Sequence, residues 1–484
     1  MSHLTVRTNF SILLKGKTVK KGLISSYFSG IADTKHGESY GKILRYFLPE
    51  FITALILYSL LYLLDAYFIA DLKSTSMYAT LGLTNTMLHF IMKVSEGLMI
   101  GGTVLVGTYN GKQRFKEAGR SFVDTFWSLL LSGIVISSLI YFGAYWIYVF
   151  YGVPKDMISI GVPFLRLRAV GIFLMFVYFA FIGFMRGIKN TKTPMKIFIV
   201  GAATFLFFDY SLIFGKFGFP ELGMQGSAMA SVLQYSVMLV LAVLYFFFNP
   251  CYKKYLINIF SVFSSGSQIK RLLKLSWRVT IDKAAIAGAY IWLGGMLTHM
   301  GKSGLATFAV VKDLERLALL PACACAQVIT FLVSNDYGKK NWDGIKANVK
   351  KIVFLSSLMS FSFLIVLSSW PKFFIQIFDK NGDFTWLAAR VFPLLSVLVF
   401  FDVLQLVLSG AMRGSSNVKT VMITRLLVCV GYFVPVSYIL SKAPIQNPVL
   451  KFCLIYGSFY VGNALMSIAY IKRFRGQDWK QQAD

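Results

Sequence analysis

A sequence element near residue 190 occurs a second time 227 residues later. The segment GFMRGIKNTKTPM at 183–195 is matched by GAMRGSSNVKTVM at 410–422, with identical residues at eight positions. A second match, between TYNGKQ at 108–113 and NDYGKK at 335–340, has the same offset. Two matches at one offset indicate that the chain consists of two copies of one unit, which is much longer than a solenoid repeat.

The composition places this duplicated chain in a membrane. Of its 484 residues, 56% are hydrophobic and 14% are charged, and the mean hydropathy is +0.64. The formal net charge of +28 could indicate a protein that binds nucleic acid. However, the lysines and arginines gather in alternate loops rather than on one basic surface, so we expect no nucleic-acid partner. A hydrophobic chain with two equivalent halves is typical of membrane transporters.

Twelve apolar runs are long enough to cross a bilayer, which takes about 20 residues. The predicted spans are 44–70, 78–108, 121–150, 159–185, 194–215, 226–248, 276–300, 304–335, 352–372, 386–412, 419–441 and 450–471. The basic loops follow the even-numbered spans, so we expect both termini in the cytoplasm. Six spans separate each repeated motif from its copy, and therefore the halves are parallel repeats.

These spans predict an all-α integral membrane protein of two six-helix bundles. The predicted units are a cytoplasmic tail at 1–43, an N-terminal bundle at 44–248, a cytoplasmic linker at 249–275, a C-terminal bundle at 276–471 and a cytoplasmic tail at 472–484. Cysteines and histidines do not have the paired spacing of a zinc site, so we expect no metal site.

The motifs around the repeat resemble those of the multidrug and toxic compound extrusion (MATE) transporters. In that family an Arg-Gly pair and a polar turn close the fourth span of each half, as at 186–194 and, with Val421 in place of proline, at 413–421. The family's aspartate before Leu-Ile-Phe-Gly, followed by Pro-x-Leu-Gly-x-x-Gly, is matched by Asp209 and by residues 212–226. The resemblance covers residues 44–471 and implies two parallel six-helix bundles in a V.

Asp65 and Asp209 are candidate ion-coupling residues of the first half. Each lies five or six residues from the outer end of its span, about 8–9 Å at 1.5 Å per residue, so the two carboxyl groups have similar depth. Neighbouring carboxyl groups in a poorly hydrated cavity can share a proton. The resemblance implies the same role. The alternative is that each carboxylate only bonds to a helix end near the outer surface.

Sodium is less favoured than the proton as coupling ion. The family often has asparagine four residues before each of these aspartates, and this chain has Leu61 and Phe205 there. Sodium coordination requires several oxygen ligands. The prediction is therefore coupling to H⁺ or Na⁺, with H⁺ preferred and no cofactor.

Asp402 is the third candidate ion-coupling residue, near the bilayer midplane, with Gln405 one turn away. Asp-x-x-Gln before Gly-x-x-Arg-Gly resembles one branch of the family, in which this aspartate couples transport to an ion. The alternative is a structural ion pair with Lys283 or Arg425. That branch also has a glutamate in the seventh span, which this chain lacks.

Other residues within the spans have less specific predictions. Aromatic faces attract cations, so Tyr178, Phe205 and Tyr210 are predicted to line a substrate cavity with Gln405. Lys93 and Glu96 are predicted to pair along one helix, with Glu96 also a cavity candidate, and the charges at 312–316 are predicted to neutralise one another. Arg186 and Arg413 are interpreted as helix-end cations that extend toward the membrane surface.

The leading functional hypothesis is a secondary antiporter that exports amphipathic, cationic organic compounds in exchange for protons or sodium. The alternative is a flippase for a lipid-linked sugar, which would favour a cationic cavity. An enzyme is not expected, because catalytic and phosphate-binding motifs do not occur; a membrane scaffold without transport remains a third hypothesis. We expect a monomer with small-molecule and lipid partners, in a bacterial inner membrane.

Overall fold

The computed structural model describes residues 31, 35–56, 60–150, 152, 154–259, 266–379, 382–476 and 478–480, so most of the predicted tail at 1–43 lies outside the description. Within these residues every regular element is a helix. The first half contains α3 (Tyr40–Leu55), α4 (Leu61–Asp71), α5 (Thr75–Gly111), α6 (Phe115–Phe150), α7 (Lys155–Gly187), α8 (Lys192–Phe214), α9 (Met224–Phe248) and η2 (Pro250–Tyr255). The second half contains α10 (Gly266–Leu297), η3 (Thr298–Met300), α11 (Gly301–Gly338), α12 (Trp342–Ser369), α13 (Pro371–Gln376), α14 (Thr385–Gly414), α15 (Val418–Val428), η4 (Cys429–Phe433), α16 (Val434–Lys442), α17 (Pro448–Arg475) and η5 (Asp478–Lys480).

These helices follow the predicted spans. In the described part of the chain ten helical segments are long and apolar enough to cross a membrane, and one of them, Gln268–Gly338, contains both α10 and α11. The first span corresponds to α3 and α4, between which residues 57–59 lie outside the description. Lipid offers the backbone no hydrogen-bond partners, and a helix satisfies its own.

One boundary differs from the sequence prediction. α10 begins at Gly266 rather than near residue 276, because its first turns are amphipathic rather than apolar. Leu272 and Leu275 in these turns are buried in the core of the first half. A hydropathy window does not detect such an extension, since its outer face is polar.

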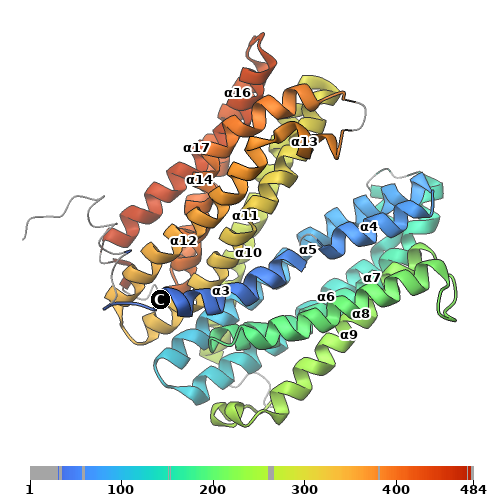
Figure 1. Cartoon of the computed structure of the whole chain (residues 1–484). Coiled ribbons are helices and arrows are strands. Elements are labelled where there is room, and N and C mark those ends of the chain that lie inside the picture. Colours follow the sequence, from blue (N-terminus) through green and yellow to red (C-terminus); the bar gives the residue numbers. More distant parts are fainter. Residues whose placement is uncertain are drawn as a thin grey trace, which may run out of the picture.

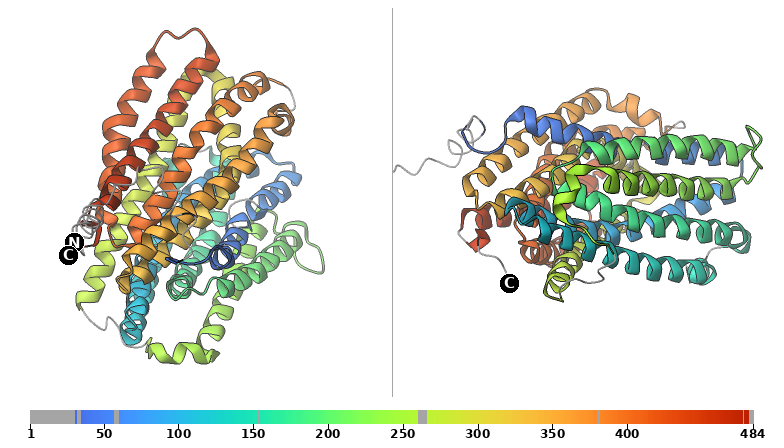
Figure 2. Two further views of the ribbon diagram at one scale, coloured as in Figure 1. Left: turned by 60° about the vertical axis from the view of Figure 1, so that its left-hand side comes forward. Right: turned by 90° about the horizontal axis from the view of Figure 1, so that it is seen from below.

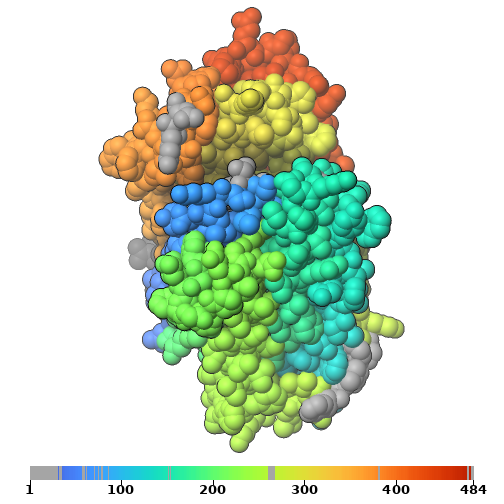
Figure 3. All heavy atoms as spheres, turned by 90° about the vertical axis from the view of Figure 1, so that its right-hand side faces the viewer, coloured from blue at the N-terminus to red at the C-terminus, as the bar shows by residue number. Residues whose placement is uncertain are grey.

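The helices form two bundles that diverge as a V (Figure 1). α3–α9 form one bundle and α10–α17 the other, and two further views show the same division (Figure 2). Viewed from the wide side of the V, the two bundles lie one above the other (Figure 3). Each bundle has its own large apolar core, while α3 packs its first turns against α11 and α12 of the other bundle.

The outward faces of the bundles are apolar, as lipid requires. On α6 the side chains of Phe142, Trp146 and Phe150 are 76%, 70% and 87% exposed, and on α9 Phe248 is 78% exposed. Exposed apolar side chains in such numbers would be unfavourable in water but not in hydrocarbon. The predicted integral membrane fold is therefore consistent with the exposed surface as well as with helix length.

The duplication is visible in the backbone of the turns. Lys189 and Ser416, 227 residues apart, have positive φ angles of 65° and 62°. Gln113 and Lys340, at the same offset, have φ angles of 60° and 58°. Positive φ is uncommon outside glycine, so two matched pairs reflect a common turn geometry in the two halves.

The helix contacts repeat at the same offset. Thr103 Oγ1 donates a hydrogen bond to the Gly183 carbonyl oxygen at 3.1 Å, and Thr330 Oγ1 donates to the Gly410 carbonyl oxygen, also at 3.1 Å. Both glycines belong to the repeated motif that the sequence revealed. The second helix of each half therefore contacts the fourth through the same pair of residue types.

The two bundles meet where α5 and α11 end, which we call the closed end of the V. A Cβ atom on Gly338 would lie 2.1 Å from the carbonyl oxygen of Thr108, and one on Gly111 would lie 2.0 Å from that of Asn335. Asn110 Nδ2 donates to Asn335 Oδ1 at 2.8 Å. The backbones approach closely because residues 111 and 338 have no side chains.

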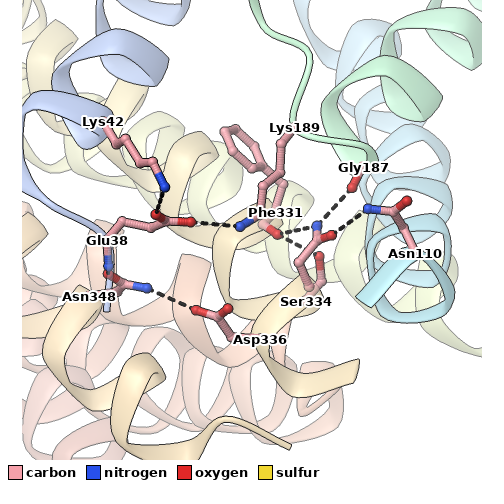
Figure 4. Close-up of polar contacts among 10 residues, drawn as sticks. Glu38, Lys42, Asn110, Gly187, Lys189, Phe331, Ser334, Asp336 and Asn348 are labelled. Atoms are coloured by element: carbon pink, nitrogen blue, oxygen red, sulfur yellow. Dashed lines mark hydrogen bonds and ion pairs between the residues drawn. The ribbon is translucent and has the colours of Figure 1, made fainter. Parts of the chain in front are cut away.

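The segment before α3 joins both bundles at the closed end (Figure 4). The backbone N–H of Glu38 donates to Asn348 Oδ1 at 2.7 Å, and Asn348 Nδ2 donates to Asp336 Oδ2 at 2.9 Å. The Glu38 carboxylate accepts from Lys189 at 3.0 Å and from Lys42 at 3.1 Å. Since Lys189 follows α7 and Asn348 lies on α12, Glu38 connects the two bundles.

Charge strengthens this connection at neutral pH. Partial burial acts to raise the pKa of Glu38, but the ammonium groups of Lys189 and Lys42 outweigh it and hold the pKa below its ordinary value. A carboxyl group whose pKa is lowered by folding stabilises the fold above its unfolded pKa, and this contribution disappears as the pH falls through the lowered value. The connection is therefore fully formed at neutral pH.

Gly338→Ala should destabilise the protein, because the new methyl group would overlap the Thr108 carbonyl oxygen. Overpacking of this kind typically costs about 1–3 kcal/mol. Thermal unfolding of the protein in detergent measures the effect. Gly288→Ala is the matched control, since nothing lies within 4 Å of a Cβ atom there. Equal unfolding temperatures for the two variants would contradict the close contact of α5 and α11.

Asn348→Ala should free the segment before α3, because the Glu38 N–H loses its acceptor and Asp336 loses a donor. Loss of a buried hydrogen-bond partner costs about 1–3 kcal/mol. Hydrogen exchange of residues 35–40 should therefore become about five- to 150-fold faster at neutral pH. Asn447→Ala, which removes the N-cap of α17, is the control and should leave this exchange unchanged.

Candidate functional site

In the first bundle three helices converge on Asp65. Arg168 Nη2, from α7, donates to Asp65 Oδ2 of α4 at 3.0 Å. Ser227 Oγ, from α9, donates to Asp65 Oδ1 at 2.6 Å, and Arg168 Nη2 also donates to Ser227 Oγ at 3.1 Å. Asp65 is only 4% exposed. Its carboxylate is therefore held by a guanidinium group, a partner that the sequence interpretation did not include.

Asp209 lies near this cluster but is bonded differently. It is fully buried on α8, and neither of its carboxyl oxygens has a hydrogen-bond partner. Asp65, Arg168 and Ser227 all lie close enough to act on its charge. The structure thus brings Asp65 and Asp209 together, as their equal depth predicts. A buried charge without a partner is costly, which makes Asp209 the group of this pair that gains most from a proton.

A cavity of about 160 Å³ adjoins Asp65. Asp65, Arg168 and Phe205 line it from the first bundle, and Arg316 lines it from α11 of the second. Asp209 is not among its lining residues. The predicted cavity residue Phe205 thus lies beside the carboxylate cluster, with 4% of its surface exposed.

A larger cavity of about 470 Å³ lies between the bundles. Residues of α3, α5, α7 and α8 line one side and residues of α10, α11 and α14 line the other. Among the predicted site residues, Asp402 and Glu96 line this cavity. His89 and Arg316 line both cavities, so the two spaces adjoin.

Asp402 forms a direct ion pair with neither Lys283 nor Arg425, although Arg425 lies close enough to act on its charge. It is 3% exposed, and its Oδ1 has no hydrogen-bond partner. Arg425 instead donates to Asp282, and Lys283 lies 3.6 Å from Glu96. Gln405 is fully buried one turn away, with no partner for either side-chain polar atom. Asp402 is thus a buried carboxyl group at the edge of the large cavity.

The predicted aromatic residues are dispersed. Tyr178 is fully buried on α7, and its hydroxyl has no hydrogen-bond partner. Tyr210 is 39% exposed and packs against Phe68 and Phe214. Neither tyrosine lines either of the two cavities. An aromatic residue next to a carboxylate in sequence points to another side of the helix, so proximity along the chain does not place it in the site.

The interpretation of Arg186 and Arg413 as helix-end cations directed to the membrane surface was wrong. Arg186 Nε and Nη2 donate to Glu50 at 2.8 and 2.5 Å, and both side chains are largely buried. Arg413 Nη2 donates to Asp282 at 2.6 Å. Glu50 lies on α3 and Asp282 on α10, the first helix of each half. Each arginine of the repeated motif therefore forms an internal ion pair.

The pair predicted within α5 is confirmed. Within 312–316, Lys312 and Arg316 lie close enough to act on the charge of Asp313, as predicted, whereas Glu315 has a different partner. Lys93 Nζ donates to Glu96 at 3.1 and 3.3 Å, as the spacing predicts. Glu315, by contrast, accepts a hydrogen bond from the Tyr456 hydroxyl at 2.5 Å rather than pairing along α11. It is 3% exposed and lines the large cavity with Asp402. Glu315 was predicted to pair locally and not to line the cavity, because its partner lies 141 residues away along the chain.

Metal coordination has little support here. In the described residues no group of three or more histidine, cysteine, aspartate or glutamate side chains could hold a metal ion. The first-half cluster already contains the positive charge of Arg168. The arrangement can instead bind or release protons at buried carboxyl groups beside a cavity.

Two helical bundles that enclose a cavity with buried carboxyl groups are typical of membrane transporters. A family model described as MatE matches residues 51–211 and 282–439, one segment in each half. The chain therefore belongs to the MatE family, which confirms the resemblance seen in the repeated motifs. Members of this family are transporters and not enzymes.

Relatives by sequence cover most of the chain. The probable multidrug resistance protein NorM of Thermotoga maritima is 23% identical over 363 residues, which cover 75% of this chain and 77% of that protein. The probable multidrug resistance protein YoeA of Bacillus subtilis is 22% identical over 364 residues, with coverages of 73% and 77%.

Solved structures at lower identity share the fold. One is a transporter of the MOP superfamily from Pyrococcus furiosus, for which a reverse polarity of the binding pocket is described. Its TM-score is 0.82 at 16% identity, over 92% of this chain and 96% of that one. An outward-facing MATE family transporter has a TM-score of 0.81 at 16% identity, over 90% and 94%. The V-shaped fold that the family resemblance implies is thereby confirmed.

A double-mutant cycle tests the ion pair of the first bundle. Asp65→Asn and Arg168→Gln should each lower the unfolding temperature in detergent, because each leaves a buried charge without its partner. The double variant should be more stable than the sum of both effects predicts, by about 0.5–3 kcal/mol. Asp65→Asn combined with Arg166→Gln is the control. Arg166 donates to the Tyr141 carbonyl oxygen instead, and additivity is expected there.

Proposed function

We propose that this chain exports amphipathic organic compounds across the membrane in exchange for protons. Coupling by protons rather than sodium is the more specific part of the proposal. The single observation that carries it is Asp209, a fully buried carboxyl group without a hydrogen-bond partner beside the Asp65–Arg168 pair. The names of the NorM and YoeA relatives, both probable multidrug resistance proteins, support drug efflux as the activity.

Proton binding at Asp209 would change the charge of the cluster. With a proton on Asp209, Arg168 and Asp65 form a balanced pair. Without it, the cluster has one excess negative charge in an apolar interior. A conformational equilibrium shifts only when a ligand binds its two states unequally, and the excess charge would favour the state in which water reaches the cluster.

Asp402 is the corresponding candidate in the second bundle, with Glu315 as a further carboxyl group on the same cavity. We propose that the two bundles, bounded as the sequence predicts at 44–248 and 276–471, move as units about the closed end. The basic loops support a cytoplasmic closed end and cytoplasmic termini. The structure would then represent an outward-facing state.

A flippase for a lipid-linked substrate remains the second candidate function. One observation favours it: basic side chains outnumber acidic ones among the residues that line the large cavity. A flippase and an antiporter differ in their coupling to protons and in the source of the substrate, which transport assays distinguish.

Asp209→Asn should uncouple transport, because asparagine resembles the protonated acid and cannot release a proton. In proteoliposomes with an imposed proton gradient, accumulation of fluorescein or rhodamine 123, whichever the wild type moves, should fall by about tenfold. Exchange without a gradient should persist. Asp71→Asn is the matched control, since Asp71 is exposed at the end of α4.

Asp402→Asn, measured in the same way, assigns coupling to one half or to both. A decrease in Asp209→Asn alone would place the proton in the first bundle. Full proton-driven accumulation in both variants, with normal insertion into the membrane, would overturn proton coupling at these carboxyl groups.

A further inference from the structure

We propose that the large cavity binds organic anions, namely a phosphate or carboxylate group attached to an apolar body. This inference rests on the proposed transport function and names its substrate class. It replaces the sequence-based hypothesis of a cationic substrate. Its basis is the charge of the side chains that the fold brings to the cavity from both bundles.

Positive charge exceeds negative charge on the cavity wall. Four carboxyl groups line the cavity, those of Glu50, Glu96, Glu315 and Asp402. Six basic side chains line it: Lys93, Arg186, Lys283, Lys312, Arg316 and Arg413. Asp282 and Arg425, which lie behind the wall and bond to each other, do not change this excess. Asp313, which lies close enough to Lys312 and Arg316 to interact with their charges, lowers it to one.

The ion pairs at the cavity differ in their balance of charge. Arg186 binds Glu50 through two nitrogens, which balances that pair. Glu96 lies between two lysines, 3.1 Å from Lys93 and 3.6 Å from Lys283. One carboxylate therefore serves two ammonium groups, one from each bundle.

Further basic side chains line the cavity from two helices. Lys312 and Arg316 lie one turn apart on α11, and His89 lies one turn before Lys93 on α5. Lys93, Lys312 and Arg316 are all close enough to act on the charge of His89. Glu315, between them in sequence, is engaged by Tyr456. Several donors from opposite walls thus surround one region, as anion binding requires.

The same cavity offers apolar surface for the body of such a compound. Phe90 and Ile291, which line it from opposite bundles, are 53% and 73% exposed. Phe179 and Phe198 extend this apolar wall. The volume of about 470 Å³ is within the range of about 300–1,000 Å³ typical of sites for small organic ligands.

A pair of xanthene dyes tests the sign of the charge. Fluorescein is a dianion at pH 8 and rhodamine 123 is a cation on a similar ring system. Fluorescence anisotropy of each dye, titrated with the purified chain in a neutral detergent, gives its dissociation constant. Fluorescein should bind about tenfold more tightly, as one charge-assisted hydrogen bond would provide. Equal or tighter binding of rhodamine 123 would overturn the proposal.

Variants assign the effect to the cavity. The double variant Lys312→Gln/Arg316→Gln should weaken fluorescein binding by about tenfold or more and should not weaken rhodamine 123 binding. Lys312→Arg/Arg316→Lys, which keeps both charges, should largely restore it. The control Lys155→Gln/Lys302→Gln removes two exposed lysines and should leave it unchanged. An equal loss in this control would show that total charge, rather than the cavity, attracts the dye.

Competition distinguishes the source of the anion. Displacement of fluorescein by 1-naphthyl phosphate, but not by 1-naphthol, would indicate a water-soluble anion. Displacement by a polyprenyl phosphate, but not by the polyprenol, would indicate a membrane lipid. Both results support recognition of the phosphate group, and failure of both phosphates to compete would overturn it.

The proposal and the transport function can fail separately. If the chain exports rhodamine 123 in response to a proton gradient but does not prefer fluorescein, the anion site is wrong and the proposed transport function stands. If fluorescein binds tightly in a manner that depends on Lys312 and Arg316, but a proton gradient moves neither dye, the anion site stands and the proposed proton coupling is wrong.

Discussion

The backbones of α5 and α11 touch at the closed end of the V, and the arrangement of both bundles depends on this contact. Gly111 and Gly338 allow it, because any side chain there would overlap a carbonyl group of the opposite helix. Close backbone approach at small residues is a general means of holding helices together in lipid, where no hydrophobic effect acts between them. Since the helices diverge from this point, the space between them widens into the cavity that both bundles line.

Within this frame the buried charges have two different environments. Arg186, Arg413 and Arg168 each bind a carboxylate from another helix, which pairs opposite charges and connects the helices. Asp209 lacks such a partner, and one oxygen of Asp402 does too. Paired charges resist change, whereas a lone carboxyl group can alter its charge with a single proton. The environment of each acid therefore follows from its partners and not from its residue type.

Much of the first-half site could be predicted from the sequence. Asp65 and Asp209 lie at equal depth in their spans, and they are indeed neighbours. The role of Arg168 could have been anticipated, because Arg166 and Arg168 both interrupt an apolar span and at least one of them requires a partner. Tyr178 and Tyr210 were assigned to the cavity from their position along the chain, which does not specify the side of the helix that faces a neighbour. Glu315 was assigned to a local pair, although Tyr456 from a distant helix bonds to it.

The sequence by itself determined the number of spans, their division into two equivalent halves and the motifs that place the chain in its family. Apolar length and repeated turn residues are local properties, so they can be identified along the chain. Only the tertiary structure decided which charges are paired and what sign the cavity wall has. These depend on contacts between residues more than a hundred positions apart, such as Arg168 with Asp65 and Arg413 with Asp282, and on which face each helix turns toward its neighbours.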